Sequence, residues 1–84
     1  MSLEQYRKTI DEIDHELVKL LEKRFEVVRK IGAYKLANNL PIHDPKREAY
    51  VLESKKALVK NLSDWPYFEK IFKQFMDISK EMEK

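Results

Sequence analysis

The stretch LEQYRKTIDEIDHELVKLLEKRFEVVRKIGAYK, residues 3–35, decides the fold because it reads as one uninterrupted helix. A heptad that starts at Leu3 places an apolar or aromatic residue at nine of its ten a and d positions. The tenth position holds Arg24, where a lone buried cation would cost several kcal/mol unless an anion meets it. The pattern therefore predicts a long amphipathic helix in which Arg24 is the first candidate functional residue.

Gly32 lies inside this helical pattern. A glycine within a helix costs about 1 kcal/mol relative to alanine. Its presence predicts close packing against another backbone or a ligand, with early fraying of the helix as the alternative.

Two shorter helices are predicted after the long one, at about residues 45–62 and 66–83. Asp44 followed by Pro45 is typical of a helix start, with the aspartate as N-cap and the proline as the first helical residue. Ser63 or Asp64 is expected to cap the third helix. The residues between the first two helices include Asn38-Asn39, which favours a turn.

The composition favours an all-α protein with a single domain at residues 1–84. The chain has 84 residues, one glycine, three prolines and no cysteine. A helix of 33 residues is roughly 50 Å long, and helices of about 17 to 20 residues cover only about half of it. A homodimer in which the long helices pair is the economical way to complete the core.

Charge and hydropathy exclude several classes of partner. The formal net charge is +2, from 17 basic and 15 acidic residues, which is far from the basic excess of a dedicated nucleic-acid binder. No apolar run is long enough to span a bilayer, and the first residues lack the apolar core of a secretory signal. We therefore expect a soluble, cytosolic protein with no nucleic-acid or membrane partner.

Several charged or polar residues lie beside the apolar rows of the predicted helices: Arg7, Arg24, Lys35, Arg47, Glu48, Ser79 and Glu83. A cluster of cations in a helical pocket suits a small ligand with several anionic groups, and Glu48 and Ser79 suit its neutral hydroxyls. Each of these residues taken alone is explained more simply as a flanking charge or a helix-dipole partner. Arg24 is the exception.

Other chemistries have little support. His15 is expected on an exposed helix face and His43 in a loop, which leaves no credible zinc site and, without cysteine, no Cys-His pair. There is no glycine-rich phosphate-binding motif.

The ordered set of motifs resembles the all-helical class of chorismate mutases over nearly the whole chain. The set is R7-x2-I10-D11-x2-D14, R24, I31-G32-x2-K35, L40-P41-I42-x-D44-x2-R47-E48-x2-V51-L52 and S79-x3-E83. The resemblance implies an intertwined homodimer of three-helix protomers. It also implies the Claisen rearrangement of chorismate to prephenate in aromatic amino acid biosynthesis, with no cofactor and no metal.

By the same resemblance, the pocket of one protomer would contain Arg24, Lys35, Asp44, Arg47, Glu48, Ser79 and Glu83, with Arg7 reaching in from the partner. Arg7 and Arg24 would bind the carboxylates, Lys35 would donate to the ether oxygen, and Glu48 would accept the ring hydroxyl. Asp44 and Arg47 would organise the pocket. Arg7 lies 28 residues before Lys35, roughly 42 Å along one helix, so only a site built across the dimer can contain both.

Glu83 departs from the commonest family pattern, in which a glutamine is the second donor to the ether oxygen. A carboxylate would oppose the negative charge that develops there, so our hypothesis is that Glu83 acts in its protonated form and shifts activity toward acid pH.

Two other functions compete with the mutase. An isochorismate-pyruvate lyase on the same fold would share the arginines and the lysine, but Asp44 and Glu48 resemble the mutases. A non-catalytic helical dimer, either a regulatory module or a coiled-coil adaptor, would explain the heptads but not the arginine at position 24.

Overall fold

A computed structural model describes residues 2–84, which form three α-helices and one short 3-10 helix. Helix α1 spans Leu3–Ala37, and Ser2 caps its first turn: the Ser2 hydroxyl accepts from the Gln5 N–H, and the Gln5 side chain accepts from the Ser2 N–H. The helix ends two residues beyond the predicted Lys35. Asn39 then adopts a left-handed conformation (φ 54°) that asparagine tolerates, so the predicted turn is confirmed.

Helix α2 spans Pro45–Lys56 and begins as predicted, because the Asp44 carboxylate accepts the Arg47 N–H at 3.1 Å. The predicted end at residue 62 is wrong. After Lys56 the chain turns, with Leu58 N–H bonded to the Lys55 carbonyl. Leu58 remains 74 % exposed, so it packs against no neighbouring element that would stabilise a further helical turn.

The 3-10 helix η1 (Leu62–Asp64) leads directly into helix α3 (Trp65–Glu83). Asp64 stands at the N-cap position of α3, but its side chain makes no capping hydrogen bond. The capping oxygen in this segment belongs to Asn61, whose side chain accepts the Ser63 N–H. Asp64 therefore occupies the predicted cap position, but the predicted capping hydrogen bond does not form. The chain enters α3 through a 3-10 turn, which already orders the first residues of the helix.

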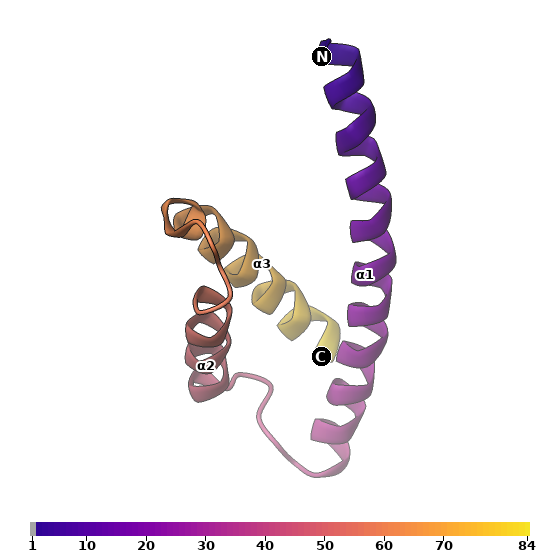
Figure 1. Ribbon diagram of the computed structural model, residues 1–84. Coiled ribbons are helices and arrows are strands. Elements are labelled where there is room, and N and C mark those ends of the chain that lie inside the picture. Colours follow the sequence, from indigo (N-terminus) through magenta and orange to yellow (C-terminus); the bar gives the residue numbers. More distant parts are fainter. Residues whose placement is uncertain (1) are drawn as a thin grey trace.

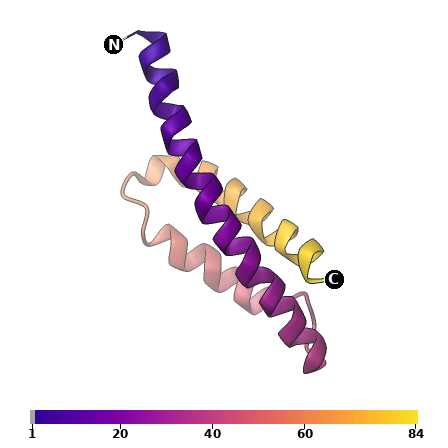
Figure 2. The ribbon, with the colours of Figure 1, turned by 90° about the vertical axis from the view of Figure 1, so that its right-hand side faces the viewer.

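Helix α3 contacts both other helices, and its C-terminal half lies beside the C-terminal half of α1 (Figure 1). The N-terminal half of α1 projects beyond α2 and α3 in both views (Figures 1 and 2). Within residues 2–84 the architecture is all-α, with one long and two shorter α-helices, which confirms the predicted fold class.

The protomer has a very small core. Val28 and Met76 are the buried hydrophobic residues of the described chain. The radius of gyration is 15.9 Å, whereas a compact chain of this length has about 12 Å. The predicted heptad seam in the projecting half of α1 is about half exposed at each position: Leu3, Tyr6, Ile10, Ile13, Leu17 and Leu20. A continuous apolar face therefore stands open along α1.

None of the helices in the described part of the chain combines the length and the apolar character needed to cross a membrane.

Candidate active site

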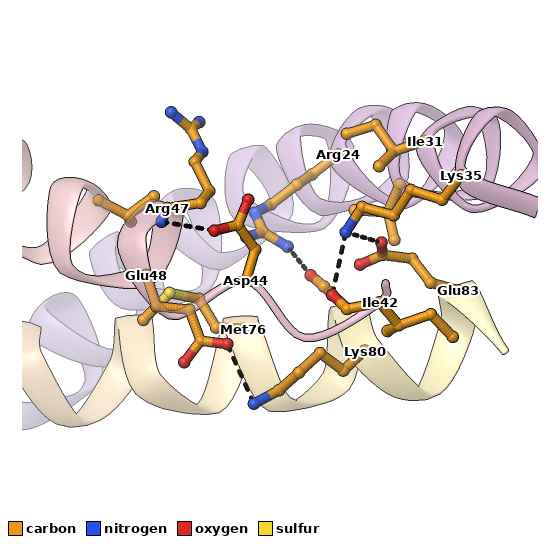
Figure 3. A pocket seen from close by; sticks show the side chains of 13 residues that line it. Arg24, Ile31, Lys35, Ile42, Asp44, Arg47, Glu48, Met76, Lys80 and Glu83 are labelled. Carbon is orange, nitrogen blue, oxygen red and sulfur yellow. Dashed lines mark hydrogen bonds and ion pairs between the residues drawn. The ribbon is translucent and has the colours of Figure 1, made fainter. Parts of the chain in front are cut away.

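A cavity of about 230 Å³ lies between the C-terminal half of α1, the start of α2 and the C-terminal half of α3 (Figure 3). Seven of the eight residues singled out in the sequence line it: Arg24, Lys35, Asp44, Arg47, Glu48, Ser79 and Glu83. The hydrophobic part of the wall comes from Val28, Ile31, Ile42, Val51 and Met76. Three helices and the loop before α2 thus bring together residues that are up to 59 positions apart in sequence.

Arg24 enters the cavity from the middle of α1. Its Nη1 donates to Ser79 Oγ at 2.7 Å, and Ser79 Oγ in turn donates to the Phe75 carbonyl at 2.7 Å. The guanidinium also lies over the Phe75 ring, 5.2 Å from its centroid. Desolvation by burial lowers the pKa of Arg24 from its ordinary value. No carboxylate pairs with Arg24 among residues 2–84, so a partly desolvated cation is held there by neutral groups alone.

Lys35 and Glu83 form the tightest charged contact of the cavity. Lys35 Nζ lies 2.6 Å from Glu83 Oε1 and donates to the Ile42 carbonyl at 3.0 Å. The two side chains are only 19 % and 7 % exposed. The contact neutralises the charge of the buried Glu83 carboxylate, and no other side chain of the described residues donates a hydrogen bond to Oε1.

Gly32 explains how Glu83 comes so close to α1. A Cβ placed on Gly32 would lie 2.9 Å from Glu83 Cα and 3.2 Å from its carbonyl oxygen. Those are backbone atoms, which cannot rotate away as a long side chain can. The predicted close packing at this glycine is confirmed, and it fixes the last turn of α3 against α1.

The start of α2 supplies the opposite wall. Asp44 is engaged as the helix cap, and the Arg47 guanidinium lies over the Tyr50 ring, 5.1 Å from its centroid. Figure 3 shows the Arg47 side chain directed away from the Lys35–Glu83 pair. The Glu48 carboxylate is 28 % exposed and takes two contacts through Oε2, from Lys80 Nζ at 3.1 Å and His43 Nδ1 at 3.4 Å.

Sequence reasoning missed Lys80, which lines the cavity from α3. The signal was present: the row Phe68, Phe72, Met76 recurs every four residues on α3, and its next member is Lys80.

Arg7 is the one predicted site residue that does not line the cavity. It lies 17 residues before Arg24, roughly 26 Å along α1, on the half of the helix that projects away from α2 and α3. No side chain of the same protomer can bridge that distance.

The cavity suits a small polyanion that also carries a hydroxyl. Its lining includes four cationic side chains and three carboxylates: Arg24, Lys35, Arg47 and Lys80 against Asp44, Glu48 and Glu83. The Ser79 hydroxyl is already both donor and acceptor, which leaves it in a binding role rather than a nucleophilic one. The arrangement can bind and orient a ligand and stabilise negative charge on it.

Comparison with known proteins gives a consistent result. The family model described as chorismate mutase type II matches residues 6–84. The chain is 32 % identical to the chorismate mutase of Methanocaldococcus jannaschii over 83 residues, which cover 98 % of this chain and 84 % of that protein.

Two further relatives are much longer proteins. The chain is 45 % identical over 51 residues to the bifunctional chorismate mutase/prephenate dehydratase of Aquifex aeolicus, and 38 % identical over 55 residues to the T-protein of Haemophilus influenzae. These matches cover 61 % and 66 % of this chain but only 14 % and 15 % of those two proteins. No solved structure is a significant match.

Proposed function

Because this chain belongs to the chorismate mutase type II family, we propose that it rearranges chorismate to prephenate in the cavity between its three helices, as a step of aromatic amino acid biosynthesis. The observation that carries the proposal is the state of Arg24, a partly desolvated cation with neutral partners only. Such a group is stabilised when an anionic ligand binds, and chorismate is a dicarboxylate.

The proposed reaction requires the protein only to position the substrate and to stabilise developing charge. The rearrangement is unimolecular, so neither a nucleophile nor a cofactor is part of the proposal. Catalysis comes from holding the enolpyruvyl side chain over the ring and from stabilising the negative charge that develops on the breaking ether oxygen. In this proposal Arg24 binds a carboxylate, Lys35 donates to the ether oxygen, and Glu48 accepts the ring hydroxyl.

Asp44 and Arg47 have supporting roles. The Asp44 cap orders the first turn of α2, and that turn carries Glu48. Ser79 holds the Arg24 guanidinium from the opposite helix.

Glu83 has two roles in this scheme, which depend on its protonation. Ionised, it pairs with the Lys35 ammonium. Protonated, it releases Lys35 and becomes a second donor toward the ether oxygen. We therefore propose that acid pH favours the active state.

We further propose that two copies of this single-domain chain form an intertwined homodimer, in which Arg7 of each completes the cavity of the other. Three observations support this: the open apolar face along α1, the small core of the protomer, and the distance of Arg7 from its own cavity. A cytosolic location is part of the same proposal and rests on the composition alone.

The decisive test is to incubate the purified chain separately with chorismate and with isochorismate, and to measure loss of each compound, formation of prephenate and release of pyruvate. Chorismate mutase activity predicts loss of chorismate with stoichiometric prephenate and no pyruvate. Pyruvate released from isochorismate would instead identify a lyase, and a dimer that leaves both compounds unchanged would identify a non-catalytic module. Arg24→Met should strongly reduce the activity in the same assay, and Arg29→Met, on the exposed face of α1, is the control for nonspecific effects of removing an arginine.

A further inference from the structure

Glu48 is held by two side chains from other parts of the chain, and both contact the same oxygen. Lys80 of α3 and His43 of the loop before α2 lie 3.1 Å and 3.4 Å from Oε2. Figure 3 shows the Lys80 side chain running along the cavity toward the Glu48 carboxylate. The other carboxylate oxygen, Oε1, has no hydrogen-bond partner among residues 2–84, so one side of the carboxylate is anchored and the other is available.

Lys80 has a second possible partner, but Glu48 is the closer one. Asp77 Oδ1 lies 3.5 Å from Lys80 Nζ on the same helix, and the Asp77 side chain is 66 % exposed. The Lys80 and Glu48 side chains are 27 % and 28 % exposed, so their pair is better shielded from solvent than the Asp77 pair. The hydrogen bond to Glu48 raises the pKa of Lys80 from its ordinary value.

We propose that Lys80 is a positioning residue that fixes Glu48 through Oε2, so that Oε1 faces the ring hydroxyl of the substrate. The proposal rests on the proposed function and extends it to a residue outside the predicted site. Two long side chains meeting across the cavity each lose rotamer freedom, and a carboxylate held in advance loses less when substrate binds.

Charge supplies the second reason for this role. A dianionic substrate repels a free carboxylate in the same cavity, and the repulsion grows as water is excluded. Lys80 offsets the charge of Glu48 without approaching from the side where the hydroxyl must bind. Glu48 can then accept a hydrogen bond beside two substrate carboxylates. Many partly exposed ion pairs contribute nothing measurable, so the role must be tested through substrate binding and not through stability.

The test is a double-mutant cycle on kcat/KM with Lys80→Met, Glu48→Gln and the double variant. We expect Lys80→Met to lower kcat/KM about 10-fold, mainly through KM, because the hydroxyl is bound before and during the rearrangement. In the Glu48→Gln background the same change is expected to cost less than about 2-fold, since Lys80 acts through Glu48. Lys80→Arg, which keeps the charge and reach, is expected to restore most of the loss.

Lys73→Met is the matched control. Lys73 is on the same helix and pairs with Glu69 at 3.8 Å, but its side chain is 58 % exposed and lies outside the cavity. Its removal is expected to leave kcat/KM unchanged. A structural readout accompanies the kinetics: in Glu48→Gln, the NMR titration of the Lys80 ammonium should move to lower pH than in the wild type.

The outcomes separate the two proposals. An active wild type with an unchanged Lys80→Met variant overturns the role of Lys80 alone. Losses that multiply in the double variant also overturn it, because they mean that Lys80 acts independently of Glu48. A Lys80 titration that Glu48→Gln does not move overturns the contact itself. A wild type that does not rearrange chorismate overturns the proposed function, and this inference with it.

Discussion

Nζ of Lys35 lies 2.6 Å from Oε1 of Glu83, so the cavity contains an ion pair at the place where the proposed reaction needs two hydrogen-bond donors. The pair joins the last turn of α1 to the last turn of α3. Whether this ion pair is broken by protonation of Glu83 when substrate binds determines how activity depends on pH.

We predict that Glu83→Gln removes the acid preference. In the wild type, kcat/KM should rise as pH falls, because a proton on Glu83 frees Lys35 and creates the second donor. A glutamine amide donates at every pH and does not hold Lys35 as an ion pair, so the variant should be flat over the same range and more active than the wild type at alkaline pH. Steady-state kinetics across the pH range measure this. An unchanged pH profile in Glu83→Gln would show that Glu83 is not the group that titrates.

Replacing Arg24 should separate activity from stability. Arg24→Met removes a partly desolvated cation that has no carboxylate partner among residues 2–84, but it also removes the hydrogen bond to Ser79 and the contact with the Phe75 ring. The free energy of unfolding is therefore expected to change by less than about 1 kcal/mol. The loss of the carboxylate-binding charge should lower kcat/KM by about 100-fold or more. Chemical denaturation and kinetics on the same preparation test both parts, with Arg29→Met as the control. A variant that loses stability and activity together would indicate a structural role for Arg24.

Gly32→Ala should impair catalysis through the backbone of α3. Alanine favours the helix by about 1 kcal/mol, but its Cβ would meet Glu83 Cα at 2.9 Å. The last turn of α3 must then move. We expect a change of less than about 1 kcal/mol in the free energy of unfolding, because the helical gain offsets the clash, and about a 10-fold loss of kcat/KM.

The control is Ala33→Gly, one residue along on the exposed side of the same helix. It should cost helix stability and leave the position of Glu83 unchanged. Full activity in Gly32→Ala would mean that the position of Glu83 is not critical.

The open face of α1 can be tested with Ile13→Glu. Ile13 is 51 % exposed in the protomer and lies in the middle of the heptad seam. Burial of two isoleucines per dimer contributes at least about 3 kcal/mol, so their replacement should raise the dimer dissociation constant by about 100-fold or more and reduce activity at low protein concentration. Sedimentation velocity measures the dissociation. His15→Glu adds the same residue to the outer face, and it should leave the dimer intact.

Local signals predicted the helix starts and the residues that gather in the cavity. Asp44 and Pro45 predicted the start of α2 correctly, because a helix cap is a local structure made by residues a few positions apart. The end of α2 was predicted six residues too late, because the apolar stripe runs on to Leu62 in the sequence. The helix ends at Lys56, beyond which no packing neighbour stabilises a further turn. Helix ends of this kind are decided by tertiary contacts.

The residues of the site also differ in whether a local signal in the sequence identified them. Arg24 stood out because a cation interrupts an otherwise apolar seam, and Gly32 because a glycine interrupts a helix. Lys80 also interrupts an apolar row, after Met76, but a lysine near the end of a helix is ordinary, so this signal alone did not identify it. Its importance depends on Glu48, which lies 32 residues earlier on another helix. The direction of the Arg47 side chain, over Tyr50, was likewise beyond what spacing can predict.

The most direct test of the shared active site is complementation between Arg7→Ala and Arg24→Ala chains, coexpressed with different tags. Each variant alone should be nearly inactive. If Arg7 serves the partner's cavity, each mixed dimer contains one intact site, and a random mixture should recover about a quarter of the wild-type activity. If activity in the mixture stays at the level of the two single variants, Arg7 and Arg24 do not act across a dimer, and the shared site is wrong.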